Sequence, residues 1–294
     1  SGPGAPIVAA TWLDPDAQAL QLAEEVVRER MGAGRAGGIE LRVRTVARPA
    51  WPIGGIDESE RFDVVLVGQV LSELDVGSLD DARVEGHAEL LGGLLDRSVD
   101  EHGSLVVIEP ALRDRTRHLH RVRDALVARG ATVFAPCMHG GPCPALARES
   151  DWCHEDVPVD LPAWLVPVAR AAGLRREGLT FSYLVARKDG VRLADSLATP
   201  LTAVRLRVVS ELIRSKGKRE AFVCGELAAE GEGSTPRPAR VKAMRLDRSA
   251  SDSNAAWTDL MRGDLLVVDP APCLPNSRID SNSQVTRSDD TESR

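Results

Sequence analysis

Short apolar segments alternate with longer amphipathic segments through the first two thirds of the chain. RFDVVLVG (residues 61–68), SLVVIEP (104–110) and ATVFAP (131–136) are rich in β-branched residues, as strands are. Between them, residues 81–101 and 115–130 carry apolar side chains at helical spacing. Because strands and helices alternate, the sequence predicts a parallel, doubly wound α/β sheet in which residues 64–67 are buried on both faces.

The pattern changes along the chain and predicts three regions. Residues 1–190, which include a cysteine loop at 136–154, form the expected α/β domain, with an amphipathic helix over Asp16–Met31. Residues 198–270 contain short strand candidates without long helices, so we expect a small β-rich appendage. Residues 275–294 are polar and predict a disordered tail.

Several classes of protein are disfavoured by composition. No apolar run approaches the roughly 18 residues of a membrane-spanning helix, so we expect a soluble protein without a membrane partner. The chain starts at Ser1 with no secretory signal pattern, which is compatible with prior removal of a targeting peptide or a first strand. The net charge of −7 disfavours a surface that coats nucleic acid throughout.

Positive charge is nevertheless concentrated in two places. Residues 201–250 hold eleven Lys or Arg against six Asp or Glu, and RDRTRHLHRVR covers residues 113–123. A solvated face and a contact with nucleic-acid phosphate both explain such runs.

Three of the five cysteines cluster in one segment, APCMHGGPCPALARESDWCHE. They are Cys137, Cys143 and Cys153, and the prolines and glycines among them predict an irregular loop after the strand at 131–136. A large domain with few cysteines is unlike a secreted disulfide scaffold. The sequence therefore predicts a reduced compartment and a metal site.

Three thiolates leave a metal one ligand short. Cys224, in a predicted strand of the appendage, is the best fourth ligand, and Cys273 is the second choice. Four thiolates suit tetrahedral zinc or a four-iron, four-sulfur cluster, and spacing alone does not decide between them. His139 and His154 flank the thiolates, either as ligands or as hydrogen-bonding neighbours of ligands. Idle buried thiols are the alternative.

The cysteine loop and its flanks resemble the methyltransferase-like proteins of the mitochondrial small ribosomal subunit and their bacterial relatives. That family carries Cys-Pro-His-x-x-x-Cys-Pro and then Trp-Cys-His, where this chain has APCMHGGPCP and then DWCH. DVVLVGQVLSEL, LVVIEPA, FSYLVARK and RVVSELIRSKGKREAFVC resemble the family's flanking motifs, so the resemblance covers roughly residues 60–265. Met138, in place of Pro, and Glu155, in place of an aromatic residue, depart from the pattern.

The resemblance implies a fold, a cofactor and partners. The fold would be a Rossmann-like methyltransferase core with a small C-terminal β-rich appendage. A four-iron, four-sulfur cluster, with zinc as the alternative, would be ligated by Cys137, Cys143, Cys153 and Cys224. The protein would be a component or assembly factor of the mitochondrial small ribosomal subunit in the matrix, or a bacterial cytoplasmic relative, with small-subunit rRNA and neighbouring ribosomal proteins as partners. The residues expected to bind RNA are Arg205, Arg207, Arg214, Lys216, Lys218 and Arg219.

The signals for catalysis are weak. An S-adenosylmethionine site needs a glycine-rich turn and an acidic residue after the second strand. Gly2, Gly4 and Asp14 are the candidates, but Asp14 follows too soon for an intervening helix, so we expect a degenerate site. GQVLSEL follows the 61–68 strand in place of Asp/Asn-Pro-Pro-Tyr and offers no obvious base. We therefore expect no catalytic residue. An active rRNA methyltransferase is the main alternative, and a zinc-stapled small-molecule methyltransferase is another.

Overall fold

The computed structural model describes residues 7–31, 35–36, 39–48, 57, 59–174, 178–197, 199–230, 234–275 and 277–288. By its internal contacts the chain divides into two compact units, Ser1–Glu60 and Arg61–Arg294. The α/β part that follows Glu60 and the β-rich part after it therefore belong to the same unit.

The first unit is a small β–α–β arrangement. β1 and β3 pair in parallel and β2 pairs antiparallel with β3. The helix between them begins where Asp16 Oδ1 accepts the backbone N–H of Gln18 at 2.8 Å, a side-chain cap at the helix N-terminus. The elements are β1 (Ile7–Asp14), α1 (Ala17–Met31), β2 (Arg35–Ala36) and β3 (Ile39–Ala47).

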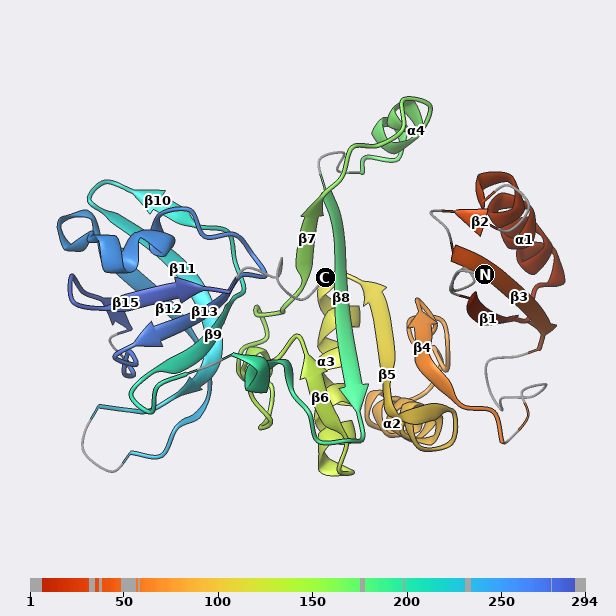
Figure 1. Ribbon diagram of the computed structural model, residues 1–294, viewed down its shortest axis with the longest axis horizontal. Helices are drawn as coiled ribbons and strands as arrows, with labels where there is room; N and C mark the ends of the chain where they lie inside the picture. Colours follow the sequence, from red (N-terminus) through yellow and green to blue (C-terminus); the bar gives the residue numbers. More distant parts are fainter. Residues whose placement is uncertain are drawn as a thin grey trace, which may run out of the picture. The chain divides into compact units, whose positions relative to one another are not determined.

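The second unit begins with a five-stranded sheet and two long helices (Figure 1). Its strand order is β4-β5-β8-β6, with β7 also paired to β8. α2 and α3 pack against each other and against β5. The elements are β4 (Phe62–Gly68), α2 (Asp80–Arg97), β5 (Val99–Pro110), α3 (Arg113–Ala128), β6 (Thr132–Ala135), the short 3₁₀ helix η1 (Pro144–Ala147), β7 (Glu155–Pro158), α4 (Leu165–Ala171) and β8 (Gly178–Arg187).

This sheet corrects two predictions. It is mixed, because β4 and β5 are parallel whereas β8 runs antiparallel to β5, β6 and β7. A parallel connection needs a crossover that packs on the sheet, and between β6 and β8 the chain forms the cysteine loop and a hairpin instead. β4 is also not buried on both faces: Val67 is 7% exposed, but Val64 and Leu66 are 60% and 63% exposed.

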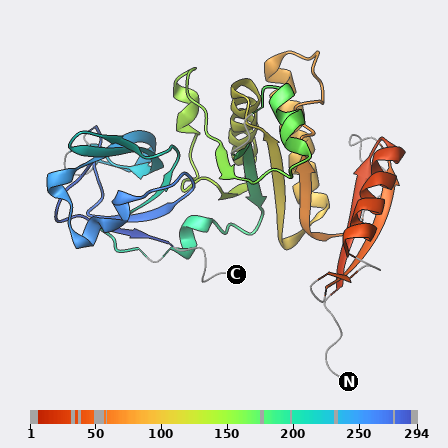
Figure 2. The same cartoon turned by 90° about the horizontal axis from the view of Figure 1, so that it is seen from above.

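A second sheet forms the β-rich part of the same unit, and it lies beside the first sheet (Figure 2). Its strand order is β14-β12-β11-β9-β13-β15, with β10 paired to β11. Its core contains Leu206, Val208, Val223, Trp257 and Leu266. The elements are η2 (Leu193–Ser196), β9 (Val204–Val208), β10 (Ile213–Ser215), β11 (Lys218–Leu227), β12 (Arg237–Leu246), η3 (Asp247–Ser249), η4 (Asp252–Thr258), β13 (Leu265–Asp269), β14 (Arg278–Ile279) and β15 (Gln284–Arg287).

The prediction of a disordered tail over residues 275–294 is wrong for residues 277–288. β14 pairs in parallel with β12, and β15 pairs antiparallel with β13. Ile279 and Val285 are 1% and 6% exposed and join the core of the β-rich sheet. Ile279 and Val285 are isolated apolar residues in a polar stretch, so the sequence showed no strand pattern there. Both side chains nevertheless pack into a core that is formed mainly by other strands.

Candidate metal centre

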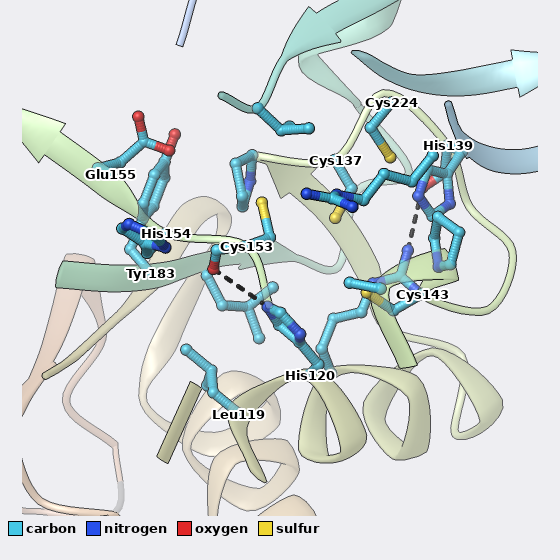
Figure 3. Close-up of a pocket in the computed structure, with 17 residues that line it drawn as sticks. Leu119, His120, Cys137, His139, Cys143, Cys153, His154, Glu155, Tyr183 and Cys224 are labelled. Atoms are coloured by element: carbon cyan, nitrogen blue, oxygen red, sulfur yellow. Dashed lines mark hydrogen bonds between the residues drawn. The ribbon is translucent and has the colours of Figure 1, made fainter. Parts of the chain in front are cut away.

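Four cysteines line one cavity in the second unit (Figure 3). Cys137 follows β6, Cys143 directly precedes η1, and Cys153 lies just before β7. The fourth, Cys224, comes from β11 in the other sheet. The second-choice ligand, Cys273, is not among the residues that line the cavity.

The C-terminal half of α3 holds the cysteine loop in place. Arg123 donates hydrogen bonds to the carbonyl oxygens of Gly141 at 2.5 Å and His139 at 3.1 Å. Asp124 pairs with Arg123 at 2.6 Å, and its Oδ2 accepts the backbone N–H of Cys143 at 3.0 Å. Charged side chains thus satisfy backbone groups that an irregular loop cannot pair within itself.

Arg117, nearly two turns earlier on α3, organises the next part of the loop. Its Nη1 donates to the carbonyl oxygens of Ala145 at 3.0 Å, Arg148 at 2.7 Å and Asp151 at 2.7 Å. The basic run at 113–123 is therefore not simply a solvated face, because Arg117 and Arg123 are directed at the cysteine loop.

Two arginines of the β-rich sheet pair with carboxylates in the cysteine loop and at the start of β7. Cys224 lies opposite Arg207 of β9 and Arg240 of β12 in the strand register. Arg207 forms an ion pair with Glu155, and Arg240 Nη1 lies 2.8 Å from Asp151 Oδ2. Positive charge from the β-rich sheet therefore meets negative charge from β7 and the cysteine loop near the four thiols.

Burial raises the pKa of three of these thiols. Burial, followed by the neighbouring Cys137, raises the pKa of Cys143 to about 12. Burial also raises the pKa of Cys153 and of Cys224, and Arg207 opposes the rise in both cases. Stable thiolates would need a positively charged group among them, which a metal ion or cluster supplies.

The cavity also contains polar atoms that lack a protein partner. His139, which is 0% exposed, makes a 3.1 Å contact from Nδ1 to the carbonyl of Gly141, so Nδ1 carries the proton. Its Nε2 then holds a free lone pair, and no described group pairs with it or with His120 Nδ1, Arg123 Nε or Arg240 Nε. The cavity volume is about 40 Å³, against roughly 10–15 Å³ for one water. Buried polar atoms without partners around such a space fit a bound polar or charged group.

Across the part of the chain that the structure describes, no three His, Cys, Asp or Glu side chains stand close enough together to hold a single metal ion. His154 stacks on Trp152, with ring centroids 5.7 Å apart.

The six predicted RNA-binding residues fall into two groups. Arg207 is 5% exposed and pairs with Glu155 beside the cavity, and Arg205, half-buried on the same face of β9, donates from Nε to the carbonyl of Leu197 at 3.1 Å. The expectation that Arg207 binds RNA is corrected, because its side chain is buried in an ion pair. Arg214 and Lys216 are exposed at the β10–β11 hairpin. Beside them Lys218 pairs with Glu220 at 3.0 Å, and Arg219 pairs with Asp247.

The residues considered for S-adenosylmethionine are only partly described. Gly2 and Gly4 lie outside the described residues. Asp14 ends β1, and its Oδ1 accepts the backbone N–H of Asp16 at 2.8 Å. The carboxylate therefore shapes the turn into α1.

Sequence reasoning missed the residues that support the cysteine loop, chiefly Arg117, Arg123, Asp124 and Arg240. A signal was present for Arg117 and Asp124. Together with His120 they are spaced three and four residues apart and lie on one face of a helix, directly before the strand that leads into the loop. Arg240 gave no such signal, because its role depends on strand pairing between distant segments.

Fold and site together define a class: an α/β protein joined to a β-rich sheet around a candidate cysteine metal centre, with an exposed basic hairpin. The model of the family described as mitochondrial small ribosomal subunit Rsm22 matches residues 19–234, and the chain belongs to this family. The match spans all four cysteines of the cavity. No curated protein matches the chain.

Family membership associates the chain with the mitochondrial small ribosomal subunit, and so with mitochondria and translation. Among the helices that the structure describes, none has the length and apolar character to cross a membrane.

Proposed function

We propose that this protein is a non-catalytic component or assembly factor of the small ribosomal subunit in the mitochondrial matrix, which binds small-subunit rRNA and holds a structural four-iron, four-sulfur cluster. One observation carries the proposal: Cys224 of β11 lines the same cavity as the three cysteines of the loop. A cluster bound there would cross-link the two sheets of the unit through four thiolates.

The ligand set alone does not distinguish a cluster from zinc, because four thiolates suit both. We propose the cluster because the cysteine pattern resembles that of the methyltransferase-like small-subunit proteins, for which the resemblance implies a four-iron, four-sulfur cluster.

The surrounding residues suit an anionic group. Arg207 and Arg240 bring positive charge beside the four thiolates, and their pairing with Glu155 and Asp151 keeps that charge in place. Arg123 and Asp124 position the backbone at Gly141 and at Cys143. These residues would hold the ligands in position before the cluster is inserted.

The β10–β11 hairpin supports the RNA-binding part of the proposal. Arg214 and Lys216 are exposed there, and the structure pairs neither with a carboxylate among the described residues. Unpaired cations on a projecting hairpin are available to phosphates, and their contacts weaken as salt rises.

A methyltransferase-like core is the finer fold that we propose. The parallel pair β1 and β3 of the first unit is compatible with such a fold, and so, taken by itself, is the sheet of the second unit, in which antiparallel β8 lies between β5 and β6. Glu109, 2% exposed at the end of β5, accepts the backbone N–H groups of Leu71 at 2.9 Å and Ser72 at 3.1 Å. This carboxylate shapes the turn after β4 and is not free to act as a base, which supports a non-catalytic role.

Two binding measurements test the proposed function. Small-subunit rRNA should bind the purified protein with an affinity that falls as salt rises, while labelled S-adenosylmethionine should show no saturable binding. Saturable binding of that cofactor together with methyl transfer to the rRNA would establish the alternative, an active rRNA methyltransferase, for which Asp14 at the end of β1 is the one described candidate contact.

A further inference from the structure

The cavity lined by the four cysteines also contains buried nitrogen atoms that the proposed ligand set does not use. Four of them belong to residues that line the cavity and have no hydrogen-bond partner among the described residues: Arg123 Nε, Arg240 Nε, His120 Nδ1 and His139 Nε2. Folded proteins rarely leave buried polar atoms unpaired. A group bound in the cavity is therefore the expected partner of these atoms.

The histidines and the arginines differ in what they offer to such a group. His120 Nε2 lies 3.3 Å from the carbonyl oxygen of Cys153, and His139 Nδ1 lies 3.1 Å from that of Gly141. A carbonyl oxygen only accepts, so in the neutral rings these nitrogens carry the proton and the unpaired nitrogens are acceptors. A guanidinium Nε always carries a proton. The donors among the four atoms are thus the two arginine nitrogens.

Arg240 is held in place around its unpaired Nε–H. It lies opposite Cys224 in the β11–β12 register, and its side chain is 13% exposed. Its Nη1 lies 2.8 Å from Asp151 Oδ2, and its Cζ lies 4.4 Å from the centroid of the Phe222 ring. An ion pair and a ring contact together fix the plane of the guanidinium. The Nε–H is therefore a positioned donor beside one of the four cysteines.

Arg123 supplies the second donor from the α/β part. It is 3% exposed on α3, and its terminal nitrogens donate to the carbonyl oxygens of Gly141 and His139. Asp124 pairs with its Nη1 at 2.6 Å. These contacts use the terminal nitrogens and leave Nε–H without an acceptor. The two donors thus come from the two parts of the unit that the cysteines join.

Sulfur chemistry gives these donors a role. Thiolate and inorganic sulfide accept hydrogen bonds, and a charged donor strengthens them. Hydrogen bonds to the sulfur atoms are among the features that set the reduction potential of an iron–sulfur cluster. A cluster bound by four thiolates is an anion, and reduction adds negative charge. Cationic donors therefore favour the reduced form.

We propose that Arg240 and Arg123 donate hydrogen bonds from Nε to sulfur atoms of the group that the four cysteines hold, and that these bonds retain the cluster and raise its reduction potential. The proposal rests on the proposed function, because it takes that group to be the four-iron, four-sulfur cluster. It adds to the four ligands a pair of residues that set the properties of the cluster.

The test uses charge-conserving variants of the full chain, purified without oxygen. Arg240→Lys keeps a cation that can pair with Asp151 but removes the Nε–H, and Arg123→Lys removes the other. Arg219→Lys is the matched control: Arg219 shares β11 with Cys224 and also has a buried, unpaired Nε, but it does not line the cavity. Iron per chain, the reduction potential from a redox titration, and the rate of iron release to a chelator are measured for each protein.

In Arg240→Lys the equilibrium between the reduced and oxidised cluster should shift toward the oxidised form by about ten-fold, a fall of roughly 59 mV for one electron. Arg123→Lys should change the potential in the same direction. Both variants should release iron a few-fold faster than wild type, and Arg219→Lys should match wild type. A purely structural role for Arg240 would lower the iron content but leave the potential of the remaining cluster unchanged.

Two failures are distinguishable in this experiment. A wild-type protein that holds zinc or no metal would overturn the cluster of the proposed function, and this proposal with it. An iron-loaded wild type whose potential is shared by Arg240→Lys and Arg123→Lys would overturn this proposal alone. A fall of the same size in Arg219→Lys would also overturn it, because the effect would then not come from donors that line the cavity.

Discussion

Arg207 and Arg214 belong to one basic stretch of sequence, yet the structure gives them opposite environments. Arg207 is 5% exposed, pairs with Glu155 and helps to surround the four cysteines. Arg214 is exposed on the β10–β11 hairpin. A count of charges along the sequence therefore does not distinguish a cation that pairs with a buried carboxylate from a cation that is exposed and can bind a partner. Substitutions in the buried region should change stability, and those in the hairpin should change binding.

The largest effect should come from the ligand that joins the two sheets. In Cys224→Ser the bound iron should be lost, and a protease should separate the β-rich part from the α/β part. Structural metal sites contribute on the order of 10 kcal/mol to folding. Cys273→Ser is the matched control, since Cys273 does not line the cavity, and it should keep its iron. Equal iron and equal protease resistance in both variants would remove Cys224 from the ligand set.

Breaking the buried ion pair should have the next largest effect. Arg207→Met leaves Glu155, which is 9% exposed, without its partner, and should lower the free energy of unfolding by about 3–5 kcal/mol. The double variant Arg207→Met with Glu155→Leu should recover much of this loss, because no charge is left buried. Arg219→Met is the control: its pair with Asp247 is more exposed and is worth about 1 kcal/mol or less. Urea denaturation gives the free energy of unfolding of wild type and of the three variants. A double variant as unstable as Arg207→Met alone would contradict the buried-charge explanation.

A smaller effect should appear on acidification, from the α2–α3 interface. Burial, followed by the neighbouring His87, lowers the pKa of His118 from 6.5 to about 4. Between these pH values the unfolded chain binds a proton that the folded chain excludes, so stability should fall as the pH falls through this window. Allowing for partial exposure, the contribution is on the order of 1 kcal/mol. His118→Gln should therefore flatten the unfolding free energy measured from pH 7 to pH 4.5. His102→Gln, whose side chain is 78% exposed, should leave the slope unchanged, and the same slope in both variants would rule out His118.

The smallest effect on stability should come from the hairpin, although binding should change. Arg214→Ala with Lys216→Ala should leave the unfolding free energy within about 0.5 kcal/mol of wild type. The dependence of log affinity for small-subunit rRNA on log salt should become shallower by roughly one unit per lost phosphate contact. Lys242→Ala, which removes a cation paired with Glu220 at 3.3 Å, is the control. An unchanged salt slope in the double variant would make the hairpin an ordinary solvated surface.

The sequence predicted much of the secondary structure and the convergence of the cysteines, for identifiable reasons. Local apolar patterns mark β4, β5, β6 and β8, and prolines and glycines mark the loop around Cys143. Cys224 was preferred to Cys273 as the fourth ligand on one assumption, that the β-rich part folds back onto the α/β part. Whether the four thiols bind a metal remains a prediction.

What the sequence could not provide depends on pairing between distant segments. The inward position of Arg207 follows from its place in β9, between β11 and β13. The strands at 278–279 and 284–287 exist because β12 and β13 offer edges to pair with. The antiparallel direction of β8 goes with a chain path that runs from β6 through the cysteine loop, β7 and α4. None of these features has a local signature.

Metal analysis of the anaerobically purified protein tests the central claim most directly. The account predicts a brown protein with about four iron and four acid-labile sulfide per chain and a broad absorption band at roughly 400 nm, and all three should be lost in Cys224→Ser but retained in Cys273→Ser. A colourless protein with one zinc per chain would contradict the cluster while keeping the four ligands. A protein that binds neither metal under reducing conditions would contradict the metal centre itself.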